Sequence, residues 1–309
     1  MDFVIFIISM GVLIWGADTI IKQSEAIALK FNISEFVIGA TLVALGTSLP
    51  EMAASVAASI NHKADMAVAN IIGSNILNIS LVLGAVFMIA KNINPNRDFF
   101  LKDSTWAIVP VFVFLLMIVD GVISRFDGVL LLFLMMAYVL FLVTDDSSSM
   151  ELEDEVDMQH FSWLKTILML IVGLVLVVVG ANFTVESASN IARSFGVSEW
   201  IIGIVMISFG TSLPELVVSI SAALKNKVDM AIGNIIGSNM ANTTIVLGAS
   251  ALANPLGIDS KAYIFDLATL LFVTLLLVFM TANKLYNKSA GISLFILLAL
   301  FLNHTIQGL

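Results

Sequence analysis

Cysteine is absent from this chain, and its absence excludes disulfide frameworks, thiolate metal sites and cysteine nucleophiles. Histidine is scarce: the three histidines, His62, His160 and His304, fall in predicted loops or at the end of a predicted helix. Charged residues make up only 12% of the sequence, whereas hydrophobic residues make up 59% and the mean hydropathy is +1.04. This composition excludes a soluble globular protein.

Apolar runs of membrane-spanning length recur along the chain, which predicts an all-α polytopic membrane protein with ten transmembrane helices. The first run is interpreted as a helix rather than a signal peptide, because no small-residue cleavage site follows it before Lys22. The predicted spans are about 3–21, 35–60, 66–90, 104–119, 128–144, 163–185, 199–223, 230–252, 263–282 and 289–306.

Two long motifs occur twice. GTSLPE stands at Gly46–Glu51 and Gly210–Glu215, and NIIGSN stands at Asn70–Asn75 and Asn234–Asn239. Both pairs are separated by the same 164 positions, from 46 to 210 and from 70 to 234. The surrounding segments align without a gap, with roughly half of the positions identical, which indicates an internal repeat.

The repeat is expected to be inverted, because five predicted spans precede an acidic segment and five follow it. An odd number of spans per copy makes the second copy enter the membrane from the other side, so a pseudo-two-fold axis lies in the membrane plane. We therefore expect a five-helix repeat over 1–144, a linker over 145–162 and a second five-helix repeat over 163–309. Two equivalent packings, each open to one face, support alternating access.

Most of the net charge of -9 lies in the linker, where DDSSSMELEDEVD supplies seven negative charges. A solvated linker is the simpler interpretation, and a divalent-cation antenna or regulatory site is the alternative. Ten of the lysines and arginines fall in odd-numbered loops and four in even-numbered loops. We expect the protein in the cell membrane, or inner membrane. The positive-inside rule then places both termini outside and the linker in the cytoplasm.

Two glutamates fall in the middle of predicted spans. Glu51 follows Glu35 by 16 residues and precedes Lys63 by 12, so both flanking charges are roughly 18–24 Å away along a helix. Glu215 repeats this placement. A carboxylate at the bilayer midplane costs several kcal/mol unless it is compensated, which indicates a functional group. The alternative, a protonated glutamate joining helices, is disfavoured by its occurrence in two identical contexts.

Pro50 and Pro214 precede these glutamates, and each removes a backbone donor and breaks the helix. We expect the freed carbonyls near Ala44–Thr47 and Ser208–Thr211 to line a protein-buried or aqueous cavity. The hydroxyls that can join them as ligands belong to Thr47, Ser48, Thr211 and Ser212.

The third and eighth spans form the other wall of the predicted site, and we expect them, like the second and seventh, to be broken helices. Their small residues also fit close helix packing. Four-residue spacing places candidate ligands on one helix face in each copy. These candidates are Ser74, Asn78, Ser238 and Asn242. For Asn75 and Asn239, structural hydrogen bonding and ligation are equally supported.

Every candidate ligand is an oxygen atom, which favours Ca²⁺, Mg²⁺ or alkali cations over Zn²⁺ or Cu²⁺. A Ca²⁺ ion between two glutamates is charge-compensated, and Na⁺ ions could displace it by occupying overlapping ligands. We expect Ca²⁺, Na⁺ and the lipid bilayer as partners, with no cofactor, no nucleic acid and no obligate protein partner.

These motifs resemble the Ca²⁺/cation antiporter superfamily, specifically a compact prokaryotic Na⁺/Ca²⁺ exchanger. The GTSLPE and GN-x-x-G-S-N type segments are similar to that family's two alpha repeats, and the ten-span layout covers the whole chain. Ca²⁺/H⁺ exchangers of the superfamily typically carry GN-x-x-E where this chain has GTSLPE, so they rank lower.

The resemblance implies a central Ca²⁺ site made by Glu51, Glu215 and the carbonyls of Thr47 and Thr211. It implies flanking Na⁺ sites made by Ser48, Ser74, Ser212, Ser238 and the carbonyls of Ala44 and Ser208, with Asn78 and Asn242 completing the polar set. Several relatives have Asp where this chain has Asn242, so ion stoichiometry and coupling to H⁺ or K⁺ stay open. Relatives slide the first and sixth helices as a gate, and Gly11, Gly16, Gly173 and Gly180 are compatible with sliding or with ordinary packing.

The function predicted from these patterns is a secondary antiporter that exchanges Na⁺ for Ca²⁺ by alternating access. A Ca²⁺/H⁺ or other cation/H⁺ antiporter is the nearest alternative, and a passive cation channel is another. An enzyme is least supported, because no nucleophile–base constellation, phosphate loop or histidine-rich metal site is present in the sequence.

Overall fold

The computed structural model describes residues 1–90, 93, 95–145, 161–196, 209–259 and 261–307. Within this part, eight helices are long and apolar enough to cross a membrane, and a bent pair of shorter helices forms a ninth candidate span. The protein is therefore a helical, multi-pass membrane protein. The seventh predicted span, 199–223, is described only from residue 209 onward, and Ser208 lies outside the described residues.

The elements follow one another along the chain in two series. The first consists of α1 (Asp2–Phe31), α2 (Glu35–Ile38), η1 (Gly39–Val43), α3 (Ala44–Thr47), α4 (Leu49–Ile60), α5 (Ala64–Leu77), η2 (Asn78–Leu83), α6 (Gly84–Ile89), α7 (Phe99–Met117), β1 (Val122–Ile123) and α8 (Arg125–Asp145). The second consists of α9 (Trp163–Ser194), α11 (Leu213–Leu224), α12 (Val228–Ala241), η4 (Asn242–Val246), α13 (Leu247–Ala253), β2 (Leu256–Gly257), α14 (Ile264–Ala282) and α15 (Lys288–Gln307).

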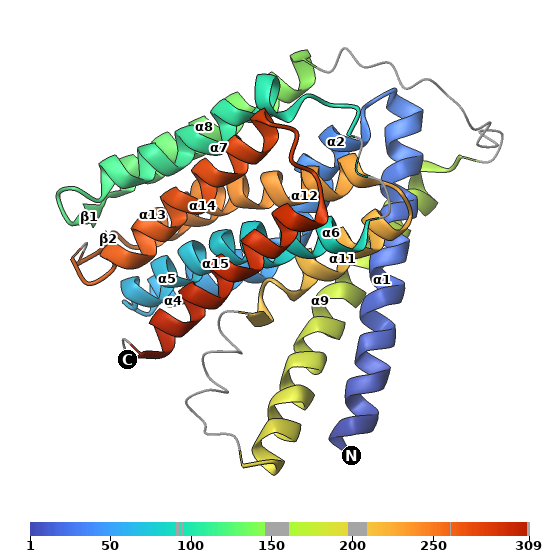
Figure 1. Cartoon of the computed structure of the whole chain (residues 1–309), viewed down its shortest axis with the longest axis horizontal. Coiled ribbons are helices and arrows are strands. Elements are labelled where there is room, and N and C mark those ends of the chain that lie inside the picture. The colour runs from blue at the N-terminus through green and yellow to red at the C-terminus, as the bar shows by residue number, and fades with distance from the viewer. Residues whose placement is uncertain (91–92, 94, 146–160, 197–208, 260, 308–309) are drawn as a thin grey trace.

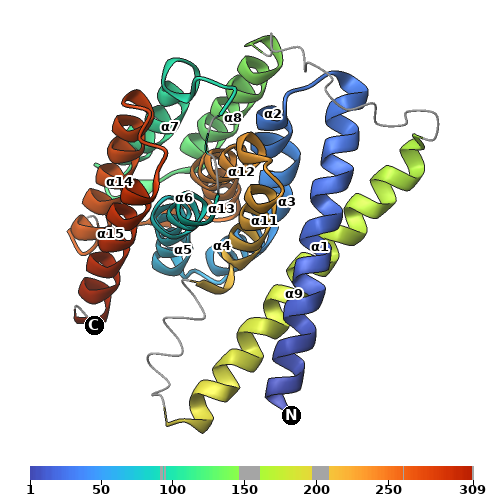
Figure 2. The same ribbon diagram turned by 45° about the vertical axis from the view of Figure 1, so that its right-hand side comes forward.

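The long helices α1 and α9 run side by side along one flank of the helical core (Figures 1 and 2). Glycines permit their close approach: a Cβ at Gly16 would lie 2.9 Å from the backbone nitrogen of Val177, and one at Gly180 would lie 2.9 Å from that of Leu13. Gly11 has no such neighbour within 4 Å. The close contact between α1 and α9 thus depends on Gly16 and Gly180, together with Gly173, and not on Gly11.

The second span bends by 46° between Thr47 and Leu49. Ser48 leaves the helical region at this point, with φ -84° and ψ 7°, and Pro50 occupies the first turn of α4. Proline fits a first turn because its missing N–H would have no partner there, but it cannot continue a helix that precedes it. The bend therefore places a new helix N-terminus, and Glu51 with it, inside the span.

The expectation that the third and eighth spans are broken is wrong. Residues Ala64–Ile89 and Val228–Ala253 are continuous helices of 26 residues each, and both contain a π-helical segment, η2 or η4. Neither helix contains proline, so every residue keeps its backbone N–H donor and the helix continues. A wider π turn stands where a break in the helix was expected. The two π segments begin at the equivalent residues Asn78 and Asn242.

Polar contacts gather the first, third, fifth and seventh connections at one end of the molecule and the second, fourth and eighth at the other. Ion pairs among the odd-numbered connections and their flanks are Asp18–Lys225, Glu25–Lys227, Glu35–Lys227, Arg97–Asp103, Arg97–Asp145 and Lys102–Asp145. At the opposite end, β1 pairs with β2 in antiparallel register, and the Ser59 hydroxyl donates to the carbonyls of Ser250 and Asn254. Figure 2 shows both termini toward the lower end and the beginning of α9 toward the upper end.

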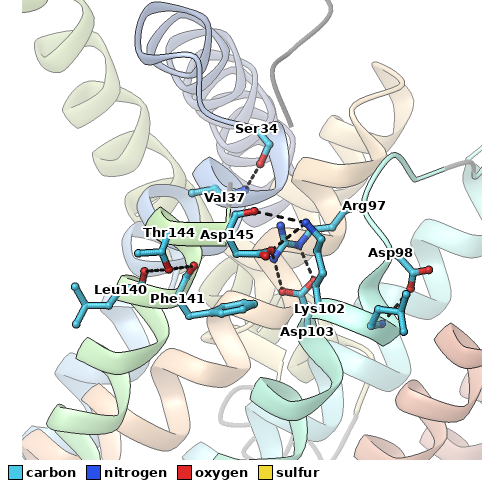
Figure 3. Close-up of polar contacts among 11 residues, drawn as sticks. Ser34, Val37, Arg97, Asp98, Lys102, Asp103, Leu140, Phe141, Thr144 and Asp145 are labelled. Carbon is cyan, nitrogen blue, oxygen red and sulfur yellow. Dashed lines mark hydrogen bonds and ion pairs between the residues drawn. The ribbon is translucent and has the colours of Figure 1, made fainter. Parts of the chain in front are cut away.

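Arg97 lies at the centre of the ion pairs that join α7 and α8 at the end of the molecule opposite the β1–β2 pair (Figure 3). Its guanidinium donates to both carboxylate oxygens of Asp103, at 2.7 and 3.0 Å, and to Asp145 at 3.3 Å. It also lies over the Phe36 ring, 4.6 Å from the centroid. Asp103 is only 1% exposed, so Arg97 supplies the charge that makes burial of this carboxylate tolerable.

Replacing Arg97 with Met is expected to lower the free energy of unfolding by about 3–5 kcal/mol, because it leaves a buried carboxylate without a partner. Lys102→Met is the matched control, since Lys102 pairs with the partly exposed Asp145 and such pairs contribute at most about 1 kcal/mol. Chemical unfolding of both purified variants in detergent measures the difference. Equal stability of the two variants would contradict this role of Arg97.

Candidate cation site

Two glutamates from opposite halves of the chain lie at the centre of the candidate site. Glu51 stands in the first turn of α4 and Glu215 in the first turn of α11, and both residues are fully buried. Their charges are close enough to repel one another. The N–H groups in the first turn of each helix have no acceptor within the helix, so they favour a negative charge there, but they do not remove the repulsion between the two carboxylates.

Buried oxygens without a hydrogen-bond partner occur on these carboxylates and on other candidate ligands. Among the described residues, the candidate ligands with such atoms are Glu51 Oε1 and Oε2, Glu215 Oε2, Ser212 Oγ, Asn78 Oδ1 and Asn242 Oδ1. Buried polar atoms without partners are costly, and native structures contain few of them. A bound cation would satisfy these oxygens and neutralise the glutamates at the same time.

Serine hydroxyls from both halves of the chain reach Glu215. Ser48, at the bend before α4, donates to Glu215 Oε1 at 3.0 Å, and Ser238 on α12 donates to the same atom at 3.5 Å. Thr211 and Ser212 lie near Glu51, but Ser212 Oγ and the Glu51 oxygens have no hydrogen-bond partner among the described residues. Ser74, the equivalent of Ser238, is buried on α5 one turn before Asn78. The structure thus brings Ser48 and Ser238 to the Glu215 carboxylate and Ser212 close to Glu51.

The threonine hydroxyls are engaged by asparagines of the other half. Thr47 Oγ1 donates to Asn234 Oδ1 at 3.2 Å, and Thr211 Oγ1 donates to Asn70 Oδ1 at 3.4 Å. These bonds leave the carbonyls of Thr47 and Thr211 as their candidate ligand atoms. The Ala44 carbonyl already accepts bonds from the Ser48 N–H and the Thr47 hydroxyl, so it is the candidate that the geometry favours least.

Asn70 and Asn234 were not among the predicted site residues. The Asn70 amide donates to Ser55 Oγ at 2.9 Å, and the Asn234 amide donates to Ser219 Oγ at 3.0 Å, so each asparagine holds a threonine of one half against a helix of the other. The sequence signal was present, because both pairs obey the offset of 164, from 70 to 234 and from 55 to 219. These asparagines are buried, which distinguishes them from solvated surface residues.

Comparisons with known proteins show the family to which the chain belongs. The chain matches the family model described as sodium/calcium exchanger protein over residues 1–144 and 165–307. It is 37% identical to the uncharacterized membrane protein MJ0091 of Methanocaldococcus jannaschii over 93% of this chain and 92% of that protein. It is 29% identical to the sodium/calcium exchanger MaX1 of Methanosarcina acetivorans over 97% of each protein. A solved structure of the sodium-calcium exchanger NCX_Mj matches with a TM-score of 0.84 and 34% identity, covering 98% of this chain and 99% of that one. The chain therefore belongs to the sodium/calcium exchanger protein family.

Proposed function

We propose that this protein is a secondary antiporter that exchanges Na⁺ for Ca²⁺, with Glu51 and Glu215 as ligands shared by both ions. The observation that carries this proposal is that the two buried glutamates and other candidate ligands carry buried oxygens without hydrogen-bond partners among the described residues. Carboxylate, amide and hydroxyl oxygens form a hard site, and the cations that such a site prefers include Ca²⁺ and Na⁺.

Each ion takes a different subset of the candidate oxygens. Ca²⁺ is held by the carboxylates of Glu51 and Glu215 and by the carbonyls of Thr47 and Thr211. The Na⁺ sites use Ser48, Ser74, Ser212, Ser238 and the carbonyls of Ala44 and Ser208, with the amide oxygens of Asn78 and Asn242 in the central set. Two carboxylates balance one Ca²⁺, which supports Ca²⁺ at the centre.

Sharing of the glutamates couples the two fluxes. An empty site would leave Glu51 and Glu215 buried and repelling one another, and such a state is too costly to be the principal form that changes access. Na⁺ and Ca²⁺ cannot both occupy the same oxygens fully. The protein therefore changes access loaded with one ion or the other, which is the condition for exchange.

We infer that ten spans form two inverted five-helix repeats and that α1 and α9 slide across the core as the gate. The offset of 164 that relates the contact pairs Thr47–Asn234 and Thr211–Asn70 supports the repeat. The glycine-mediated contact between α1 and α9 supports their movement as one unit. Separate polar contacts at the two ends fit termini outside and a cytoplasmic linker over 145–162, of which residues 146–160 lie outside the described part.

The test of this function is ⁴⁵Ca²⁺ uptake into proteoliposomes loaded with Na⁺ and diluted into Na⁺-free buffer. Uptake that requires internal Na⁺ and stops when the Na⁺ gradient is dissipated is the expected result. A parallel arm replaces the Na⁺ gradient with a pH gradient. Uptake driven by the pH gradient alone would overturn the proposal in favour of proton coupling, and uptake without any counter-ion would overturn it in favour of a channel.

A further inference from the structure

We propose that Asn75 and Asn239 are positioning residues that orient the amides of Asn78 and Asn242, so that only oxygen atoms face the transported ions. This inference rests on the proposed function and specifies how the site keeps its cation preference. It assigns Asn75 and Asn239 to hydrogen bonding rather than to ligation.

The first step is the direction of the bonds between the four asparagines. Asn78 Nδ2 donates to Asn239 Oδ1 at 3.0 Å, and Asn242 Nδ2 donates to Asn75 Oδ1 at 3.1 Å. The opposite atoms, Asn78 Oδ1 and Asn242 Oδ1, are buried and have no partner among the described residues. Each amide therefore binds protein through nitrogen and leaves its buried oxygen available to bind an ion.

The second step is what fixes the orienting residues themselves. Asn75 Nδ2 donates to the Asn239 backbone carbonyl at 3.4 Å, and Asn239 Nδ2 donates to the Asn75 backbone carbonyl at 3.2 Å. Because each Nδ2 is committed to a backbone carbonyl, each Oδ1 must face the neighbouring amide. All four bonds join α5 and η2 of the first half to α12 and η4 of the second.

The third step is the consequence of losing this arrangement. A free amide on Asn242 could rotate and present its NH₂ group to the ion, because an amide carries donors on one side and an acceptor on the other. A donor facing a cation removes a ligand and adds repulsion. Groups that orient a metal ligand in this way typically change metal affinity by about 10–100-fold when they are replaced.

The substitution that tests this role is Asn75→Leu, which removes the acceptor for Asn242. A cavity of about 20 Å³, lined by Asn75, Trp106 and Pro110 among others, gives the larger side chain some room. Asn75→Asp is the partial-rescue variant, because it keeps an acceptor oxygen for Asn242 but loses the donor to the Asn239 carbonyl. Thr244→Val is the matched control: Thr244 is fully buried on η4, and within the described part of the chain its hydroxyl donates to the Met240 carbonyl of its own helix and to no residue of the first half.

The measurement is equilibrium ⁴⁵Ca²⁺ binding to each purified variant, together with kcat and KM for Na⁺-driven Ca²⁺ uptake. Asn75→Leu is expected to weaken Ca²⁺ binding about 10–100-fold and to raise KM more than it lowers kcat. Asn75→Asp is expected to recover part of the affinity, and Thr244→Val to match the wild type. Binding by Asn75→Asp that is no stronger than binding by Asn75→Leu, or wild-type binding by Asn75→Leu, would overturn the positioning role.

If Asn75→Leu does not yield monodisperse protein, Asn239→Leu and Asn239→Asp repeat the test at the equivalent position of the second repeat, where the side chain is less buried. The outcome also separates the two proposals. If the wild type exchanges Ca²⁺ for Na⁺, and Asn75→Leu and Asn239→Leu bind Ca²⁺ as tightly as the wild type, only the positioning role is refuted. Wild-type protein that does not bind ⁴⁵Ca²⁺ refutes the proposed function itself.

Discussion

Glu51→Gln and Glu215→Gln are each expected to abolish Na⁺-dependent Ca²⁺ uptake while the protein stays folded. Each change keeps the size of the side chain but removes one of the two charges that balance Ca²⁺, and it places an amide donor where a cation is to bind. Because the buried pair then carries only one charge, the ion-free variants are expected to be at least as stable as the ion-free wild type. Uptake assays and thermal unfolding measure both effects.

Ligand-induced stabilisation gives an independent readout of the same variants. Ca²⁺ at about one hundred times its Kd stabilises a binding protein by about 2.7 kcal/mol, and this shift should be seen in the wild type and be missing from both variants. Glu186→Gln is the matched control, since Glu186 is exposed on α9. Ca²⁺ uptake at the wild-type rate in either Glu51→Gln or Glu215→Gln would refute the assignment of the site.

Gly237→Ala is expected to cause the largest structural loss. A Cβ at Gly237 would press on the carbonyl oxygen of Ala40 and would lie 2.6 Å from its Cα, so backbone rather than a movable side chain blocks it. Relief requires α12 to move away from η1, which displaces Ser238 from Glu215. We expect destabilisation above the roughly 1–3 kcal/mol typical of overpacking, with loss of transport.

Gly11→Ala provides the comparison for Gly237→Ala, because both glycines are helical and a Cβ at Gly11 meets no atom within 4 Å. Alanine has the higher helix propensity, so Gly11→Ala is expected to preserve or slightly raise stability. Thermal unfolding and the yield of monodisperse protein in detergent distinguish the two. A Gly237→Ala variant as stable as Gly11→Ala would show that α12 does not need this close approach.

The parts of the site that can be predicted from sequence are the residues whose burial in a membrane costs free energy and the residues that recur in the internal repeat. Glu51 and Glu215 stand out in the sequence because a midplane carboxylate is costly, and the structure buries both residues fully. The bend before Glu51 follows from Pro50, because proline removes a donor wherever it occurs. These signals are local, so one sequence is sufficient to carry them.

The parts that could not be predicted depend on which helix faces which. Asn75 and Asn78 are both asparagines in one helix, and nothing in their spacing says that Asn75 accepts a hydrogen bond while Asn78 Oδ1 has no partner. That division arises only when α12 approaches α5. The π segments at η2 and η4 were missed for a related reason, because neither proline nor any other local residue type marks them.

The most direct test of the central claim, that Na⁺ and Ca²⁺ share one pair of carboxylates, is equilibrium ⁴⁵Ca²⁺ binding to purified protein titrated with Na⁺ at constant ionic strength. The account predicts one Ca²⁺ per chain at the Glu51–Glu215 site, displaced completely by Na⁺ with an apparent Kd that rises as Na⁺ increases. Ca²⁺ that stays bound at saturating Na⁺ would contradict it, because the two ions would then occupy separate sites and could not exclude one another.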